Sequence, residues 1–258
     1  MKNRQRDMAL LELENVNKKF GGLIALSEFE LKVQQGEILG LIGPNGSGKT
    51  TTFNVITGFL KPDGGKVIFE GKDITGLQPH GIAKMGVIRT FQLANLFFEL
   101  TVLDNILIGF HNLSKIKIFD ELLNSRSRRK REEELLAKAV EILRLTELDS
   151  HKDKLAKNLS AGWRKTLAIA VALAANPKLL LLDEPVCTLS PARVASIMNL
   201  VMRLRDSGVT VMLIEHNMRA IMDYCDRIAV LNFGKKIADG SPEQVKQNRE
   251  VIDAYLGA

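Results

Sequence analysis

The stretch GEILGLIGPNGSGKTTTFNVI, residues 36–56, decides the fold. Its first part, up to Ile42, is short and almost wholly apolar, which predicts a strand buried on both faces of a parallel sheet. Gly43 to Thr50 fit the pattern G-x-x-x-x-G-K-[ST], and a helix is expected to start at Lys49. A strand, a glycine-rich turn and a helix in this order predict a phosphate-binding loop.

The residue types in this loop suit a bound polyphosphate. Glycines let backbone N–H groups turn toward phosphate oxygens because no Cβ obstructs them, and the following helix directs its positive end at the same anion. We expect Lys49 to reach the β- and γ-phosphates and the Thr50 hydroxyl to bind Mg²⁺. The residues expected to contact nucleotide here are Gly43, Pro44, Asn45, Gly46, Ser47, Gly48, Lys49, Thr50 and Thr51. An ordinary glycine-rich loop is the alternative, and it needs neither flanking element.

The rest of the chain predicts an α/β fold with an insertion. Residues 10–20, 27–33 and 66–74 read as strands of an N-terminal antiparallel β subdomain, and 178–185 and 209–216 as buried parallel strands. Helices are expected over 160–175, 191–207 and 242–255, and the pattern from about residue 97 to 159 is helical. We therefore expect a P-loop NTPase (RecA-like) core at 8–92 and 160–258 and an α-helical subdomain at 93–159, together one domain over 1–258.

Charged side chains follow the two later apolar strands. Asp183, at the end of LLLLD, is expected to hold Mg²⁺ together with Thr50, and Glu184 to face the γ-phosphate, where a carboxylate polarises an attacking water. A helix N-cap is the alternative role for this acidic pair, because Pro185 follows. Glu215 and His216 end the next strand, where a histidine by itself is more often structural than catalytic.

Composition narrows the function classes. With 45% hydrophobic and 26% charged residues, the chain is typical of globular proteins; it has no apolar run of membrane-spanning length and no signal-peptide pattern. Two cysteines form no disulfide framework or metal-ligand spacing, which favours a reducing cytosol. The net charge is +6, and the basic run Arg126–Arg131 is followed by three glutamates, which indicates a solvated helix face; anionic lipid headgroups are the other interpretation. No aromatic interleaving of the nucleic-acid-binding kind is present.

The order of the motifs carries a resemblance. The phosphate loop, Gln92 in RTFQ, a helical insertion, LSAGWRK at 159–165, LLLLDEP and IEH follow one another as in the nucleotide-binding domain of ABC transporters, over almost the whole chain. The resemblance implies ATP hydrolysis with Mg²⁺. It also implies that Gln92 contacts the metal and the reacting phosphate, that Glu184 is the general base, that His216 is the switch histidine and that Phe20 stacks on adenine.

The segment LSAGWRK is similar to the family signature LSGGQ but departs from it. Leu159, Ser160 and Gly162 match, whereas Ala161 and Trp163 differ. We expect Ser160 to cap a helix that points at a nucleotide held by a second subunit, so two chains, as a homodimer or with a paralogue, face each other head to tail. Ser190 stands where the family commonly has Asp or Asn. The departures at Trp163 and Ser190 predict normal ATP binding with weaker hydrolysis or coupling.

A finer resemblance concerns the transported solute. The stretches at 20–76, 86–109 and 237–258 look like the ATP-binding subunits of branched-chain amino acid importers and of their urea- and amide-importing relatives. This implies separate integral-membrane permease subunits docking near Leu93–Leu100, a periplasmic solute-binding protein acting indirectly, no nucleic-acid partner, and a peripheral position on the cytoplasmic face of the plasma membrane. A soluble ABC ATPase without a transporter, or an ATP-binding regulatory partner with weak hydrolysis, are the alternatives.

Overall fold

The computed structural model describes residues 9–90, 96–111 and 125–256. The chain forms two compact units, the first from Met1–Arg89 and Lys178–Ala258 and the second from Thr90–Pro177. Each unit has its own cluster of buried apolar side chains. Both sheets lie in the first unit, which also carries the phosphate loop.

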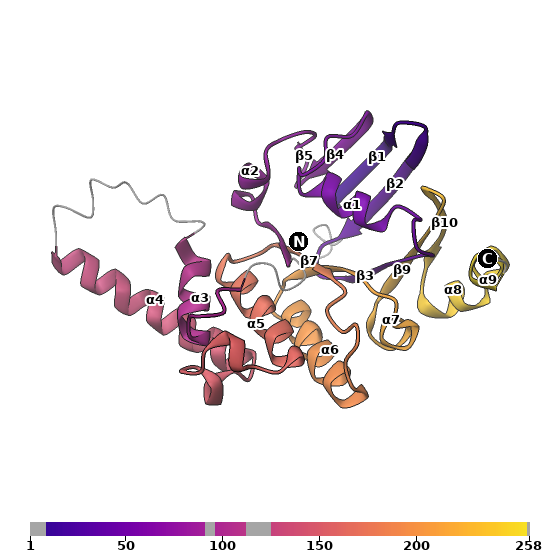
Figure 1. The fold of residues 1–258 in the computed structure, drawn as a ribbon. Coiled ribbons are helices and arrows are strands. Elements are labelled where there is room, and N and C mark those ends of the chain that lie inside the picture. Colours follow the sequence, from indigo (N-terminus) through magenta and orange to yellow (C-terminus); the bar gives the residue numbers. More distant parts are fainter. Residues whose placement is uncertain (1–8, 91–95, 112–124, 257–258) are drawn as a thin grey trace, which may run out of the picture. The chain divides into compact units, whose positions relative to one another are not determined.

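The first sheet of this unit is antiparallel, as the alternating sequence predicts (Figure 1). Its order is β2-β1-β4-β5, and its strands are β1 (Ala9–Phe20), β2 (Leu23–Gln34), β4 (Gly64–Phe69) and β5 (Lys72–Asp73). Along β2, buried and exposed side chains alternate from Phe29 to Val33, so one face is apolar. That face contributes Leu26, Phe29, Leu31 and Val33 to the core of the unit.

The second sheet has the order β10-β9-β3-β8-β7-β6. Its strands are β3 (Ile38–Ile42), β6 (Val87–Thr90), β7 (Leu179–Asp183), β8 (Thr210–Ile214), β9 (Arg227–Asn232) and β10 (Lys235–Gly240). Strand β3 pairs in parallel with β8 and β9, and β7 with β8, whereas β10 runs antiparallel to β9. Every residue of β3 and β8 is buried, as continuous apolar strands of a parallel sheet require.

The helices expected from Lys49 and over 191–207 are present in the first unit, whereas the short helices at 79–84 and 218–224 were not among the expected elements. The helices of this unit are α1 (Lys49–Ile56), α2 (Pro79–Lys84), α6 (Pro191–Asp206), α7 (Met218–Tyr224), α8 (Pro242–Gln247) and α9 (Arg249–Leu256). The single helix expected over 242–255 is wrong. Asn248 adopts an extended backbone, and its side chain accepts a hydrogen bond from the Val251 N–H, so it ends α8 and caps α9.

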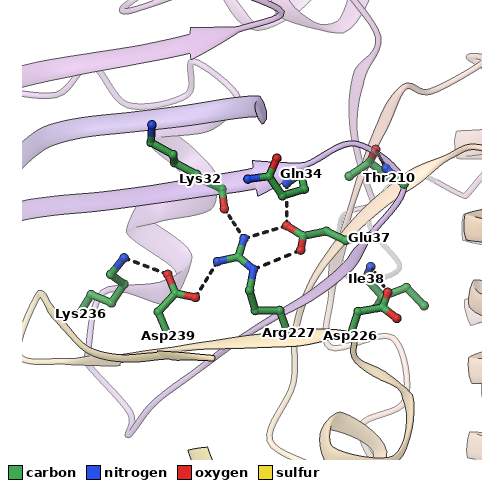
Figure 2. Close-up of polar contacts among 10 residues, drawn as sticks. Lys32, Gln34, Glu37, Ile38, Thr210, Asp226, Arg227, Lys236 and Asp239 are labelled. Carbon is green, nitrogen blue, oxygen red and sulfur yellow. Dashed lines mark hydrogen bonds and ion pairs between the residues drawn. The ribbon is translucent and has the colours of Figure 1, made fainter. Parts of the chain in front are cut away.

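An ion-pair network joins the two sheets at the amino end of β3. The Arg227 guanidinium on β9 lies between Glu37 and Asp239, at 2.8 Å and 2.6 Å, and also donates to the Lys32 carbonyl on β2 (Figure 2). Glu37 in turn accepts a hydrogen bond from the Gln34 N–H. Since the phosphate loop follows the other end of β3, this network stabilises the sheet away from the pocket.

The second unit is helical, as expected for the insertion. It contains α3 (Val102–His111), α4 (Ser125–Leu145), α5 (Ala161–Ala174) and short 3₁₀ turns at Asp149–His151 and Ala156–Asn158. A Cβ at Gly109 would lie 2.6 Å from the Val171 carbonyl oxygen, so α3 and α5 pack with their backbones close together. Because α5 shares its apolar core with α3 and α4, the unit extends to Pro177, whereas the sequence pattern placed the boundary at residue 159.

Candidate active site

A pocket of about 300 Å³ lies where the phosphate loop meets the ends of β7 and β8. Residues of the loop line it together with side chains from β1, β2 and the two later strand ends. The lining residues are Phe20, Leu23, Ala25, Asn45, Gly46, Ser47, Gly48, Lys49, Thr50, Thr51, Glu184, Ile214 and His216. The structure thus brings into one place most of the residues that the sequence predicted to contact nucleotide.

Tight packing fixes the conformation of the loop. Gly43 has φ +151°, and a Cβ there would lie 2.0 Å from the Leu231 carbonyl oxygen. Gly48 has φ +112°, and its Cβ would lie 2.4 Å from the Ala25 carbonyl oxygen. Both positions exclude a larger residue through backbone conformation and through contact.

The turn between β9 and β10 packs against the phosphate loop and forms a hydrogen bond with it. The Gly234 N–H donates to the Ser47 carbonyl at 2.9 Å, and the Gly234 carbonyl accepts from the Ser27 N–H at 2.9 Å. A Cβ at Gly234 would lie 2.8 Å from the Ala25 carbonyl oxygen. Backbone from strands β2 and β9–β10 therefore holds the loop in place.

Polar groups in the loop suit an anion. The Lys49 ammonium is buried and donates to the carbonyls of Gly43 and Pro44, at 2.8 Å and 2.9 Å. Burial lowers the pKa of Lys49, while Glu184 and Asp183 oppose that shift. The buried Ser47 hydroxyl oxygen has no hydrogen-bond partner among the described residues. A phosphate would supply acceptors for the Lys49 and Ser47 groups, so the site fits a polyphosphate.

Glu184 and His216 lie in direct contact. The Glu184 Oε1 to His216 Nε2 distance is 3.2 Å, and both side chains are partly exposed to the pocket. Glu184 has φ +49°, a conformation that is rare outside glycine, and its N–H donates to the Ile214 carbonyl at 2.9 Å. A carboxylate next to an imidazole can orient a water molecule and move its proton. The helix N-cap alternative for this acid is wrong, because α6 begins only at Pro191.

Two buried charged residues of the site were not foreseen. Glu215 is 1% exposed and accepts N–H bonds from Val186, His216 and Asn217. Arg89, on β6, forms an ion pair with Asp183. In the sequence, each of these two residues is marked only as a charged residue next to an apolar run. That pattern does not predict which groups Glu215 and Arg89 contact.

Comparison with known proteins identifies the family. Residues 26–187 match the family model described as ABC transporter, and residues 235–258 match the model described as branched-chain amino acid ATP-binding cassette transporter. The high-affinity branched-chain amino acid transport ATP-binding protein LivG of Escherichia coli K12 is 41% identical, over 96% of this chain and 98% of its own length.

The chain belongs to the ABC transporter family.

Solved structures agree with this assignment. The ADP conformation of MJ1267, an ATP-binding cassette of an ABC transporter, superposes with a TM-score of 0.86 at 37% identity, over 97% of this chain and 100% of that one. A dimeric bacterial cassette, MJ0796, gives a TM-score of 0.75 at 29% identity, over 90% and 98% of the two chains. The P-loop NTPase core with an antiparallel β subdomain and a helical insertion is confirmed. The chain is an ATP-binding cassette, the ATPase of a transporter.

The signature segment of this cassette lies in the second unit. Ser160 occupies the N-cap position of α5, but its hydroxyl makes no capping bond, so the predicted capping role of the side chain is wrong. Gly162 is buried in the first turn. Trp163 packs against the apolar core of this unit, with its ring 4.5 Å from that of His151.

Other predicted positions are only partly described. Gln92 and residues 93–95 lie outside the described residues. Phe97 and Phe98, in the same expected docking segment, are exposed. Phe20 ends β1 with an exposed ring, and the Lys18 ammonium lies 5.6 Å from its centroid. Across the described ranges, no helix combines the length and apolarity needed to cross a membrane.

Proposed function

We propose that this cassette binds MgATP in the pocket and hydrolyses it to drive an importer for branched-chain amino acids. The observation that carries the proposal is the phosphate loop facing Glu184 and His216 across one pocket. The amino acid class rests on the function named for the LivG relative and on the match of residues 235–258. The two compact units would act as one ATP-binding domain.

The side chains of the pocket suggest a role for each residue in ATP hydrolysis. Lys49 and the N–H groups of the loop bind the phosphates, and the exposed Phe20 ring stacks on adenine. Thr50 and Asp183 would hold Mg²⁺, with Gln92 as a further ligand; the ion would neutralise charge on the β- and γ-phosphate oxygens. Glu184 orients the attacking water as general base, and His216 holds Glu184 and stabilises developing charge.

A second cassette would complete the site. The Ser160 hydroxyl is exposed at the start of a 14-residue helix and makes no capping bond there, which leaves it available to an external acceptor. We infer that Ser160 and Gly162 of one subunit reach the nucleotide held by the other, in a homodimer or heterodimer. Trp163 and Ser190, which depart from the family pattern, would weaken hydrolysis or coupling rather than ATP binding.

The transporter would supply the remaining partners. Integral-membrane permease subunits would dock on residues 93–100, where Phe97 and Phe98 offer exposed aromatic surface, and Gln92 would transmit nucleotide state to that segment. A periplasmic solute-binding protein would deliver the amino acid. The cassette would then sit peripherally on the cytoplasmic face of the plasma membrane.

The test separates binding, hydrolysis and transport. Lys49→Ala should abolish binding of fluorescent ATP, whereas Glu184→Gln should keep binding, stop turnover and trap an ATP-dependent dimer on a sizing column. Unchanged binding and turnover in Lys49→Ala, or a monomeric Glu184→Gln protein with ATP, would refute the proposal. Leucine uptake by proteoliposomes holding the co-purified permease tests the solute, and a soluble ABC ATPase would co-purify with no membrane protein.

A further inference from the structure

A buried arginine contacts the acid proposed to hold the metal. Arg89 lies on β6, and its side chain is 5% exposed. Its Nη2 lies 2.6 Å from Asp183 Oδ2, and its Nη1 donates to Asn54 Oδ1 at 2.6 Å. The guanidinium carbon is 5.4 Å from the centroid of the Phe53 ring. One side chain thus connects β6, β7 and α1, the helix that follows the phosphate loop.

These contacts restrict the Asp183 carboxylate. A guanidinium is a rigid planar fork, so the bond to Asn54 determines the direction in which the other arm meets Asp183. The Asp183 side chain is only 12% exposed, so surrounding protein atoms limit its rotation. Among the described residues, Arg89 engages Oδ2 and no hydrogen bond reaches Oδ1. Oδ1 is therefore the oxygen that remains for a metal or its water.

Asn54 links this arrangement to the phosphate loop. It lies four residues after Thr50 on α1, and residues at this spacing share one face of a helix. Thr50 and Asp183 are the two proposed metal-holding side chains of the described part of the chain. Arg89 therefore sets the register between the helix that carries one and the strand that carries the other.

We propose that Arg89 is a positioning residue that fixes the Asp183 carboxylate for Mg²⁺. This inference rests on the proposed function, because it assumes MgATP in the pocket. Arg89 does not touch the nucleotide in this role; it acts through Asp183. Two other roles make different predictions. An arginine that competes with the metal for Asp183 would weaken metal binding, and a purely structural arginine would alter the whole pocket.

The test is a metal titration of nucleotide binding. Fluorescent ATP is bound to wild-type protein, Arg89→Gln and Arg89→Lys, first in EDTA and then with increasing Mg²⁺. Residues that orient metal ligands typically change metal affinity by about 10- to 100-fold, so we expect Arg89→Gln to raise the half-saturating Mg²⁺ concentration by roughly 10-fold. Arg89→Lys keeps the charge without the fork and should give a smaller increase. Affinity in EDTA should stay at the wild-type value.

Mn²⁺ provides a spectroscopic readout, because the electron paramagnetic resonance spectrum of Mn²⁺ bound with ADP should broaden in both variants if Asp183 is no longer held. Lys178→Gln is the matched control: it removes a cation of the same unit, paired with Glu70 in an exposed ion pair, and should change neither readout. If Arg89→Gln does not fold, the same measurements are made on Arg89→Lys and Asn54→Ala. Each of these variants removes one of the contacts that orient the group facing Asp183.

Three results would overturn the inference. The first is a half-saturating Mg²⁺ concentration that does not change in Arg89→Gln. The second is a lower half-saturating Mg²⁺ concentration, which would mean that Arg89 competes with the metal. The third is a loss of ATP affinity in EDTA as large as the loss with Mg²⁺, which would mean a structural role. Failure of the proposed function itself is separate, because the wild-type protein would then show no nucleotide binding that depends on Lys49.

Discussion

Replacing Glu215 by glutamine should destabilise the protein although the change is isosteric. The carboxylate is 1% exposed; Oε1 accepts the Val186 N–H at 2.6 Å, and Oε2 accepts those of His216 and Asn217 at 3.1 Å and 3.4 Å. A glutamine keeps one acceptor oxygen for Val186 but presents an NH₂ group to the other two donors. Because an unsatisfied buried donor costs about 1–3 kcal/mol and the 3.4 Å contact is weak, we expect a loss of about 1–3 kcal/mol in the free energy of unfolding.

The assay is thermal unfolding of the purified cassette. For a chain of this size, 1 kcal/mol shifts Tm by about 2–4 °C, so Glu215→Gln should lower Tm by roughly 2–12 °C. Glu30→Gln, on the exposed face of β2, is the matched control and should leave Tm unchanged. Because Glu215 holds the backbone of His216, the ATPase rate should fall as well. A Glu215→Gln protein that melts with the wild type would show that this carboxylate does not hold the two strand ends together.

Three further outcomes follow from other parts of the molecule. Trp163→Gln should raise the ATPase rate of the dimer but lower Tm, since the indole packs in an apolar core; an unchanged rate would show that Trp163 does not limit turnover. Burial raises the pKa of the Cys225 thiol to about 12. Alkylation of the native protein at about pH 8 should therefore label the partly exposed Cys187 and leave Cys225 unmodified. Rapid labelling of Cys225 would contradict this expectation. Arg227→Gln leaves Glu37 half-buried without its cation and should lower the urea midpoint by the equivalent of about 1–3 kcal/mol; an unchanged midpoint would mean that the network contributes no stability.

The sequence predicted those features that depend on local pattern. The runs at 38–42 and 179–182 are apolar throughout, which predicted central strands, and the glycine spacing at 43–48 predicted the phosphate-binding loop. The start of α1 at Lys49 was correct for the same reason. Local features failed where two signals compete, as at Asn248, whose side chain starts a new helix inside a continuous helical pattern.

Contacts between distant residues could not be predicted in this way. Arg89 and Asp183 are 94 residues apart, and Glu215 and Val186 are 29 apart. Each pair depends on which strands become neighbours, and a single sequence does not specify this. Ser160 shows the same limit on a smaller scale, because its N-cap position was foreseen whereas the direction of its hydroxyl was not.

The turn that contains Gly234 determines when the protein becomes competent during synthesis. The phosphate loop is translated early, yet its Ser47 carbonyl finds its partner only at residue 234, and Gly43 lies against Leu231. A ribosome-bound chain that has not yet exposed β9 and β10 therefore has the nucleotide motif without its support. Nascent chains should acquire ATP affinity only near the end of translation, once residues 227–240 have left the ribosome and β9 has paired with β3.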